Sequence, residues 1–297
     1  MSKPLRIVGR ILGGLVALIL LVVVVSYAVS ASRLEKHYEV AAANIAVPTD
    51  SASIARGHVL ATLNGCTSCH GSTLGGRVMI DQFPFARLPA PNLTRGAGGI
   101  GATYTDADWE RAIRHGVRRD GTPLFIMPAN EFNPMRDEEL GRLIAYAKSV
   151  PPVDNANQPS RTIYPLARVL HTFGAPLVSA EHIDHTKQVK VAPPPSASLA
   201  YGEYVAGACK FCHGADLSGQ EVGGEPGAPP SPPIGPTGRP AKWTEAQFFQ
   251  TMRTGVTPEG WKLRNEYMPW QAIGQLGDDE LRAVLLYLKQ PVAVAAR

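Results

Sequence analysis

The sequence predicts an all-α protein in which two helical domains of one kind follow a single N-terminal transmembrane helix. Three observations predict this fold class: an apolar N-terminal stretch, a Cys-x-x-Cys-His pentapeptide that occurs twice, and helix signals from the first half that recur in the second. The expected parts are an anchor (1–32), a tether (33–50), a first domain (51–152), a linker (153–196) and a second domain (197–297).

The N-terminal stretch is long enough to cross a bilayer. Ile11 to Ser32 comprises 22 residues without a charge, and about 20 apolar residues span the hydrocarbon core as a helix. Three basic residues precede it, whereas Glu35 dilutes those that follow, so the positive-inside bias leaves the rest of the chain outside the cytoplasm. The alternative is a signal peptide cleaved near Ala28-Val29-Ser30, but the apolar stretch outruns a typical signal core. We therefore expect a retained, single-pass anchor.

The two pentapeptides contain all four cysteines of the chain: Cys66-Thr-Ser-Cys69-His70 and Cys209-Lys-Phe-Cys212-His213. This pattern is typical of c-type haem attachment, in which both cysteines form thioethers and the adjacent histidine ligates the iron. A zinc site or a thioredoxin-like motif would need further ligands or a βαβ context, and neither is present in the sequence. We expect two covalently bound haem c groups.

Each pentapeptide lies among helix signals. In the first domain, residues 53–64 have helical apolar spacing and lead into Cys66, and Thr105-Asp-Ala-Asp108 predicts a capping box for a helix that stops at Gly116. Residues 137–149 predict another helix, with acids in its first turn and Lys148 in its last. The Gly- and Pro-rich residues 71–104 predict a loop over the haem.

The second domain repeats these signals after a long linker, in which residues 168–171 predict a short helix. Thr244-Glu-Ala-Gln247 is again a capping box, and Asp137-Glu-Glu-Leu140 returns as Asp278-Asp-Glu-Leu281. The loop after the second motif differs, since residues 225–240 contain seven prolines. We interpret it as a stiff cover for the haem, with a polyproline ligand for a partner as the alternative.

The repeat also predicts the second axial ligands, commonly Met in such sites. Met127 lies 13 residues before Leu140, Met268 lies 13 residues before Leu281, and both are followed by Pro. Met135 is the competitor in the first domain, but its counterpart is Leu276, which cannot ligate iron. We therefore predict His70 and Met127 on one iron and His213 and Met268 on the other. Met79 and Met252 are predicted to be packing residues.

Other polar clusters favour ordinary surface roles. Arg111, Arg114, Arg118 and Arg119 predict a solvated helix face, with an acidic partner or a haem propionate as alternatives. His182 and His185 predict solvated linker residues, although a metal site is conceivable. The net charge of +4 and the aromatic share of 7% argue against a nucleic-acid partner.

The layout resembles the class I cytochrome c fold, present twice. Within that family, Pro91-Asn-Leu-Thr94, Gly99-Ile-Gly101, the Thr-Asp helix start and Met-Pro are similar to the membrane-bound cytochrome c subunits of bacterial quinoprotein and flavoprotein dehydrogenases. The resemblance covers residues 51–152 and 197–291. It implies redox partners such as a membrane dehydrogenase, a quinol-oxidising complex, an oxidase or a small soluble cytochrome.

We therefore expect a dihaem cytochrome that relays single electrons at the outer, periplasmic face of the cytoplasmic membrane in a respiratory chain, rather than an enzyme. One alternative is a dihaem redox enzyme, peroxidase-like or thiosulfate-oxidising, which would need an open or exchangeable iron site. The other is a haem-based sensor, which would need an output domain that the sequence does not leave room for.

Overall fold

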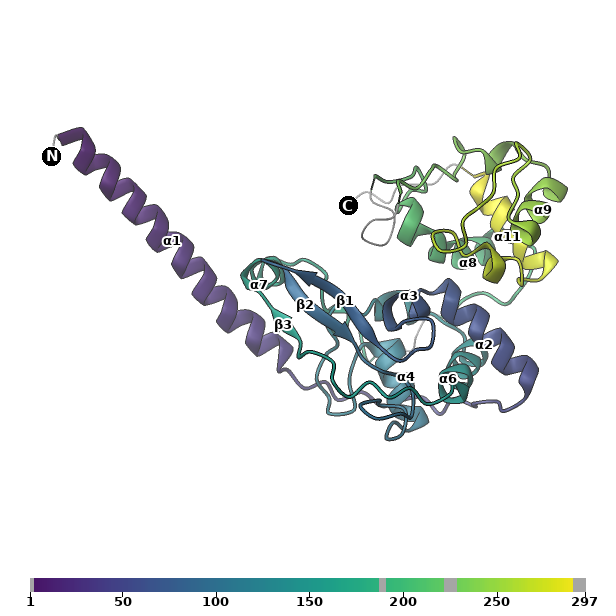
Figure 1. Cartoon of the computed structure of the whole chain (residues 1–297), viewed down its shortest axis with the longest axis horizontal. Helices are drawn as coiled ribbons and strands as arrows, with labels where there is room; N and C mark the ends of the chain where they lie inside the picture. Colours follow the sequence, from purple (N-terminus) through teal and green to yellow (C-terminus); the bar gives the residue numbers. More distant parts are fainter. Residues whose placement is uncertain (1–2, 187–190, 222–228, 291–297) are drawn as a thin grey trace. The chain divides into compact units, whose positions relative to one another are not determined.

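The computed structural model describes residues 3–186, 191–221 and 229–290 and is mostly helical (Figure 1). This agrees with the predicted fold class. The chain forms two compact units. Unit 1 comprises Met1–Val47, Cys69–Pro134 and Ala147–Val189, and unit 2 comprises Pro48–Ser68, Met135–Tyr146 and Lys190–Arg297.

Unit 1 begins with the long apolar helix α1 (Lys3–Leu34). Within it, Pro4–Leu34 is long and apolar enough to cross a membrane by length and composition. The following segment, predicted as a tether, has no regular structure but packs onto unit 1. The backbone N–H of Tyr38 donates to the Gly121 carbonyl at 2.9 Å, and the Tyr38 and Val40 side chains pack on a buried cluster that includes Leu34.

A small sheet occupies part of the segment that the sequence predicted as loop, residues 71–104. β1 (Arg77–Gln82) pairs antiparallel with β2 (Ala86–Ala90), which also pairs with the two-residue β3 (Thr162–Ile163). The loop prediction is therefore wrong for the hairpin. Alternate residues of β2 are buried, as the period of a half-buried strand requires, and its Pro89 lies beyond the part that pairs with β3.

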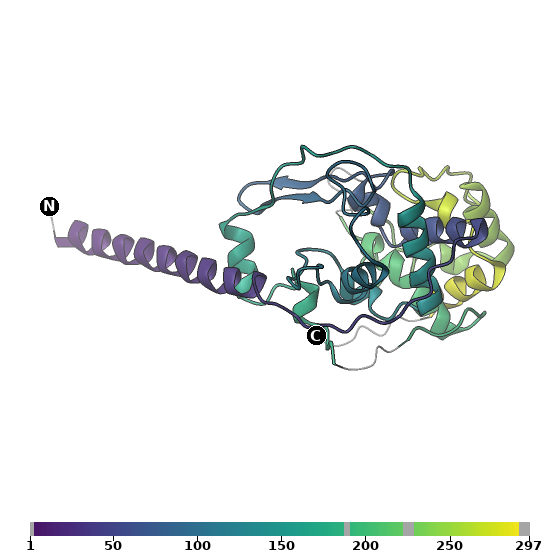
Figure 2. The ribbon, with the colours of Figure 1, turned by 90° about the horizontal axis from the view of Figure 1, so that it is seen from below.

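Two helices of unit 1, α4 and α7, lie where the sequence predicts them. α4 (Asp106–His115) has the predicted Thr105–Asp108 capping box and ends at Gly116 in the left-handed conformation. The short helix α5 (Ala129–Phe132) follows. In the linker, α7 (Pro165–Thr172) confirms the short helix predicted at 168–171, and a 3-10 turn follows at Ser179–Glu181. Figure 2 shows α7 beside the C-terminal end of α1.

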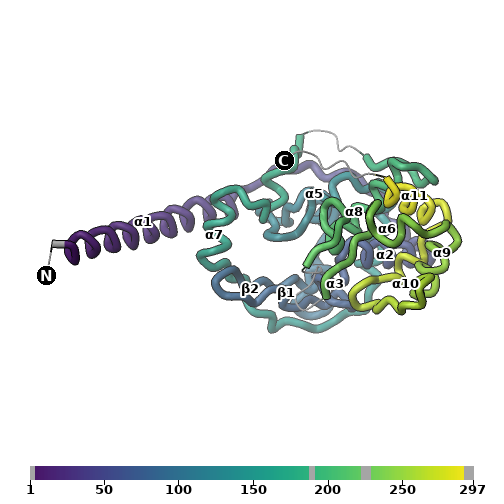
Figure 3. The backbone as a smooth tube through the Cα atoms, turned by 90° about the horizontal axis from the view of Figure 1, so that it is seen from above, coloured from purple at the N-terminus to yellow at the C-terminus, as the bar shows by residue number. Residues whose placement is uncertain are grey.

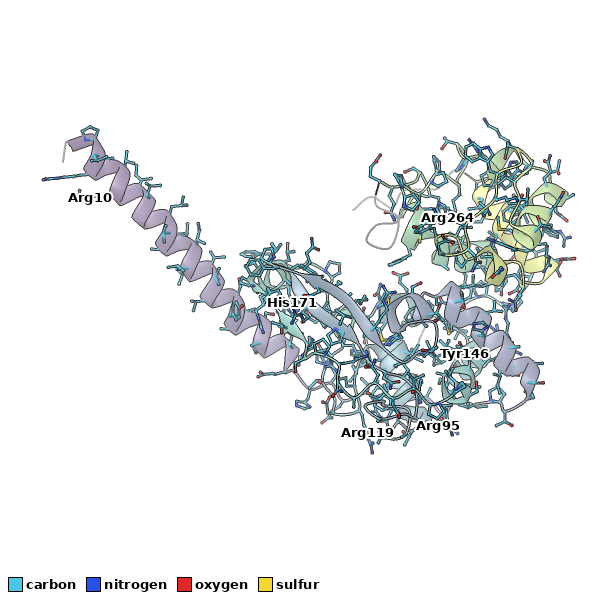
Figure 4. The ribbon with its side chains drawn as sticks, viewed as in Figure 1. Arg10, Arg95, Arg119, Tyr146, His171 and Arg264 are labelled. Carbon is cyan, nitrogen blue, oxygen red and sulfur yellow. The ribbon has the colours of Figure 1, made fainter. Side chains whose placement is uncertain are left out.

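Unit 2 contains two crossed helix pairs. α2 (Ser51–Leu63) crosses α6 (Asp137–Ser149), and α8 (Leu199–His213) crosses α11 (Asp278–Leu288; Figure 3). Glycine permits both crossings. A Cβ on Gly57 would lie 2.0 Å from the Arg142 carbonyl oxygen, and one on Gly202 would lie 2.0 Å from that of Ala283. The next contacts are with Cβ of Tyr146, labelled in Figure 4, and of its repeat counterpart Tyr287.

Buried polar groups connect these helices. Arg56 of α2 forms an ion pair with Glu280 of α11 at 2.5 Å. The Tyr201 hydroxyl donates to Glu280 at 2.7 Å, and the Tyr204 hydroxyl donates to Glu139 at 2.8 Å. Because both tyrosines lie on α8, the network links α8 to α6 through Glu139 and to α11 through Glu280.

The remaining helices of unit 2 cover its core. They are a 3-10 turn (Pro240–Lys242), α9 (Glu245–Thr254) and α10 (Trp270–Ile273). The predicted Thr244–Gln247 capping box is present, and Gly255 ends α9 in the left-handed conformation. The first part of the proline-rich loop, 225–228, lies outside the described residues, and the rest up to Arg239 is irregular apart from a bridge between Ser231 and Gln220.

Candidate haem sites

Both pentapeptides are helical, which places their reactive side chains on one face. Cys66–His70 forms the short helix α3, and the second pentapeptide is the last turn of α8. Residues three and four apart are neighbours on a helix, so both cysteines and the histidine of each motif are directed to the same side. Gly65, with a φ of 72°, separates α3 from α2, whereas α8 is continuous.

The cysteine side chains are half-buried in both motifs. Burial raises the pKa of the Cys209 thiol to about 11, with a smaller contribution from the neighbouring Cys212. This thiol is therefore protonated at neutral pH.

Each motif histidine is oriented by a proline carbonyl. His70 Nδ1 lies 2.9 Å from the Pro91 carbonyl oxygen, and His213 Nδ1 lies 2.8 Å from that of Pro232. Because a carbonyl only accepts hydrogen bonds, Nδ1 carries the proton in both rings. Nε2 then keeps its lone pair for a metal, as in other sites where a ligating histidine donates its second ring N–H to the backbone.

Both histidines are also held neutral. Burial lowers the pKa of His70 and of His213 below the ordinary value of 6.5, and the proline carbonyls oppose this shift only in part. A neutral imidazole is the form that binds iron. The rings have the same hydrogen bond and the same direction of pKa shift in both halves of the chain, and the role of His70 and His213 as iron ligands remains a prediction.

The turn that follows each Cys-x-x-Cys-His motif has the same backbone conformation in both halves of the chain. Leu74 and Leu217 are fully buried and have positive φ values of 54° and 60°, which is rare for a residue with a branched side chain. Their carbonyls accept from the N–H groups of Leu93 and Ile234 at 2.8 and 3.0 Å. These bonds lie next to the proline carbonyls and position them against the histidines.

Sequence reasoning did not identify Pro91 and Pro232 as histidine partners. In the sequence, Pro91 stands out only as part of the Pro91-Asn-Leu-Thr94 motif, and Pro232 is one of seven prolines in residues 225–240. They follow their histidines by 21 and 19 residues. This near-equal spacing is the signal in the repeat that could have found them.

The two predicted methionine ligands occupy equivalent places. Met127 and Met268 immediately precede the prolines that begin α5 and α10, and both side chains are half-buried. The Ser179 hydroxyl donates to the Met127 carbonyl at 2.8 Å. Met268 packs against the same buried cluster as Cys209. The assignment of both as iron ligands remains a prediction.

The other methionines are placed as packing residues where the structure tests them. Met135 and its counterpart Leu276 are buried, with 2% and 3% of their surfaces exposed. Met252 belongs to the core of unit 2. An apolar counterpart at equal burial indicates that Met135 fills core volume.

The residues of each half fit a covalent haem. Each half supplies two thiols on one helical face, one neutral imidazole with Nδ1 oriented by a carbonyl, and one half-buried thioether before a short helix. Within the described residues, 3–186, 191–221 and 229–290, no separate cluster of three or more His, Cys, Asp or Glu side chains could hold another metal ion.

The arginine cluster is not the solvated face that the sequence predicted. Arg114 is buried, 3.3 Å from Glu110, and Arg118 donates to the Pro123 carbonyl at 2.8 Å. Arg119 alone of these has a largely exposed side chain. The helical spacing of the cluster placed some of its members against the body of unit 1.

The prediction of solvated linker histidines is wrong for His185. Its Nδ1 lies 3.1 Å from Nδ1 of the buried His115, and its Nε2 lies 3.0 Å from the Ala180 carbonyl oxygen. Burial lowers the pKa of His185. His182 is exposed, as predicted.

Two family models match the chain. The cytochrome c family matches residues 54–151, and the family described as cytochrome C oxidase, cbb3-type, subunit III matches residues 198–288. Each match covers one of the pentapeptides and its helices. The second match therefore describes the same kind of domain as the first.

Curated relatives cover most of this chain. The fructose dehydrogenase cytochrome subunit of Gluconobacter japonicus is 26% identical over 279 residues, which is 82% of this chain and 53% of the relative. The cytochrome c subunit of the quinone alcohol dehydrogenase of Gluconacetobacter polyoxogenes is 27% identical, over 81% and 56%. A diheme cytochrome c-type protein of Cereibacter sphaeroides is 24% identical, over 80% and 86%. The chain thus spans about half the length of the first two.

Proposed function

Since the chain contains two cytochrome c domains and is distantly related to dehydrogenase cytochrome subunits, we propose that it is a membrane-anchored dihaem cytochrome that relays single electrons. The observation that carries the proposal is the repeated histidine geometry. Two motif histidines, His70 and His213, have Nδ1 on a proline carbonyl and Nε2 left for iron. Two equivalent sites in one chain suit transfer from one site to the next.

The proposal gives each side chain a role. Cys66, Cys69, Cys209 and Cys212 would hold the two groups through thioether bonds, so the groups stay with the chain through every turnover. Bound haem supplies one-electron chemistry through its iron, and His/Met ligation raises its reduction potential.

Occupancy of the second axial position by methionine distinguishes an electron relay from an enzyme. Met127 and Met268 would fill the second axial positions, so that no exogenous molecule binds there. Side chains that stay in place leave little to rearrange when an electron arrives or leaves. An enzyme would instead need one of these positions open.

The membrane location is supported by packing at the end of α1. Ser30 is fully buried and Leu34 belongs to the core cluster of unit 1. Cleavage near Ala31 would remove Ser30 and uncover the surface on which it packs. We therefore favour the retained anchor, with both haem domains on the periplasmic side of the cytoplasmic membrane.

The partner is proposed by analogy. The relatives named above are cytochrome subunits of fructose and quinone alcohol dehydrogenases. A membrane dehydrogenase would therefore be one redox partner. A quinol-oxidising complex, an oxidase or a small soluble cytochrome would be the other.

Carbon monoxide binding tests the relay. The full-length protein, purified from membranes and reduced at neutral pH, should bind carbon monoxide slowly and incompletely at both haems. It should also exchange electrons rapidly with a small soluble cytochrome. A stable adduct that forms quickly at one haem would show an open iron and would favour the peroxidase-like or sensor alternative.

A further inference from the structure

The C-terminal end of α1 carries a polar stripe that α7 covers. Ser26 and Ser30, one helical turn apart, are buried. The Thr172 hydroxyl donates to the Ser26 carbonyl at 3.3 Å, and the Ser30 hydroxyl lies 3.1 Å from Nδ1 of His171, which Figure 4 labels. The docking of α7 therefore accounts for the Ser30 hydroxyl in an otherwise apolar helix, whereas the bond to Ser26 is to its backbone carbonyl.

Charged groups secure the same contact. Arg33 of α1 donates to the His171 carbonyl at 3.1 Å, and His171 Nε2 lies 2.9 Å from a Glu181 carboxylate oxygen. Arg168 of α7 lies over the ring of Tyr27, 4.5 Å from its centroid. Hence α7 is fixed to the last turns of α1 by contacts at several points.

This contact sets the depth of α7 if α1 spans a bilayer. The uncharged stretch ends at Ser32, and a helix rises about 1.5 Å per residue. Ser26 and Ser30 then lie within about 10 Å of the outer end of the hydrocarbon core. A helix packed on them lies at the level where apolar chains meet headgroups.

At that level, α7 and the hairpin tip expose an apolar surface. Leu166, Leu170 and Phe173 are 42%, 40% and 74% exposed, and their spacing places them on one helical face. Phe83, 78% exposed at the tip between β1 and β2, contacts the ring of Tyr164 just before α7. We name these four residues the α7 patch.

We propose that the α7 patch is immersed in the outer leaflet of the membrane and holds unit 1 against the bilayer in one orientation. The proposal rests on the retention of α1 as an anchor. The opposite face of α7, with Ala167 and His171, is buried in unit 1, so the helix has one protein-facing side and one apolar side left over. Such a division is typical of helices that lie in a membrane interface.

Continuity with α1 identifies lipid as the occupant. The side chains of α1 that precede the contact, such as Leu21, Val24 and Val25, are exposed and apolar. A spanning α1 surrounds them with lipid, and α7 is attached to the very next turns. The nearby Arg168–Tyr27 pair adds the basic and aromatic side chains that favour headgroup level.

A fluorescent probe tests lipid contact directly. An environment-sensitive fluorophore is attached to a cysteine introduced as Phe173→Cys in the full-length holoprotein, which is reconstituted in phosphatidylcholine nanodiscs. Doxyl-labelled phosphatidylcholine should then quench this probe much more strongly than the control probe, because position 173 lies in the leaflet. The matched control is Arg95→Cys, an exposed residue of unit 1 that lies away from α1 and α7 in Figure 4, and it should lose little. Wild-type protein shows whether native cysteines take up label.

A third position separates this proposal from the anchor itself. A probe at Leu18→Cys, in the middle of α1, should be quenched if the anchor is retained. Quenching at position 18 with none at 173 would overturn the α7 proposal and leave the anchor standing. Loss of residue 18 from the mature protein would overturn both. A probe at 173 that is shielded only in native membranes would show a protein partner on the patch and would also refute lipid contact.

Discussion

Replacement of Gly202 by alanine should separate the two helices that cross at this residue. The new Cβ would lie 2.0 Å from the Ala283 carbonyl oxygen and 2.6 Å from its carbon, whereas ordinary contact begins at 3.4 Å. Both atoms belong to the backbone of α11, so no side-chain rotation can relieve the clash. The helices must move apart by more than about 1 Å, and overpacking of this kind costs about 1–3 kcal/mol of unfolding free energy or more.

Gly207 of the same helix is the matched control, since a Cβ there would meet nothing within 4 Å. Alanine is favoured over glycine inside a helix by about 1 kcal/mol. Gly207→Ala should therefore stabilise unit 2. Gly202→Ala has the same gain in helix propensity, but it also disrupts the packing of α8 against α11. The two variants should differ by about 1–3 kcal/mol, which corresponds to about 2–12 °C in melting temperature for a unit of this size.

The assay is thermal unfolding of the holoprotein in detergent, followed by far-ultraviolet circular dichroism and by haem absorbance. Gly57→Ala should repeat the effect at the other crossing, where the obstacle is the Arg142 carbonyl. Equal melting temperatures for Gly202→Ala and Gly207→Ala would refute the tight crossing. So would a loss in Gly207→Ala as large as that in Gly202→Ala.

Three further predictions follow from the sites and the polar network. Mass spectrometry of the denatured protein should find two haems still attached, and one haem or none would contradict the motif assignment. Met127→Leu should abolish the methionine-to-iron absorption band of one haem and lower its potential, because a thioether ligand favours ferrous iron, whereas Met135→Leu should leave the band unchanged. Burial raises the pKa of Glu280, but hydrogen bonds from Tyr201 and the Gly277 N–H, with the Arg56 charge, hold the pKa below its usual 4.5. Its stabilising effect is therefore present above the unfolded pKa and lost as the pH falls through the folded pKa, so denaturant titrations of Glu280→Gln should lack that part of the acid-side loss.

The opposite pH dependence is expected at Glu139 and provides the control for the last prediction. Burial raises the pKa of this carboxyl despite the hydrogen bond from Tyr204. Its folded pKa lies above the unfolded one, so stability falls as the pH rises through that interval. If the free energy of unfolding falls equally with decreasing pH in wild type and in Glu280→Gln, the Glu280 carboxyl does not change its pKa on folding and the prediction is refuted.

Signals between residues close together in the chain were sufficient to predict many of the helices and their ends. The capping boxes at Thr105 and Thr244, the helix end at Gly116, and the helix over residues 137–149 are present as predicted. The physical reason is that caps and helical spacing act over a few residues. The attachment motifs are equally local, since one helical turn contains every reactive atom.

The internal repeat carried the prediction further than local signals alone. It selected Met127 over Met135, and the structure gives Met135 a buried, apolar counterpart in Leu276. It could also have led to Pro91 and Pro232, because their spacing from the motif histidines is nearly the same. Their carbonyls matter only as acceptors, however, and a backbone atom leaves no residue-type signature.

Tertiary structure alone decided the features that pair distant segments. The hairpin of β1 and β2 lies in a Gly- and Pro-rich stretch whose composition predicted a loop. It was not predicted because strand pairing depends on the partner strand rather than on composition. The contact of His185 with the buried His115 joins segments 70 residues apart. Gly57 and Gly202 became interpretable only when a second helix was found against each. The docking of α7 on α1 joins residues 141 positions apart in the chain, Ser30 and His171, and such contacts arise from complementary surfaces that form only on folding.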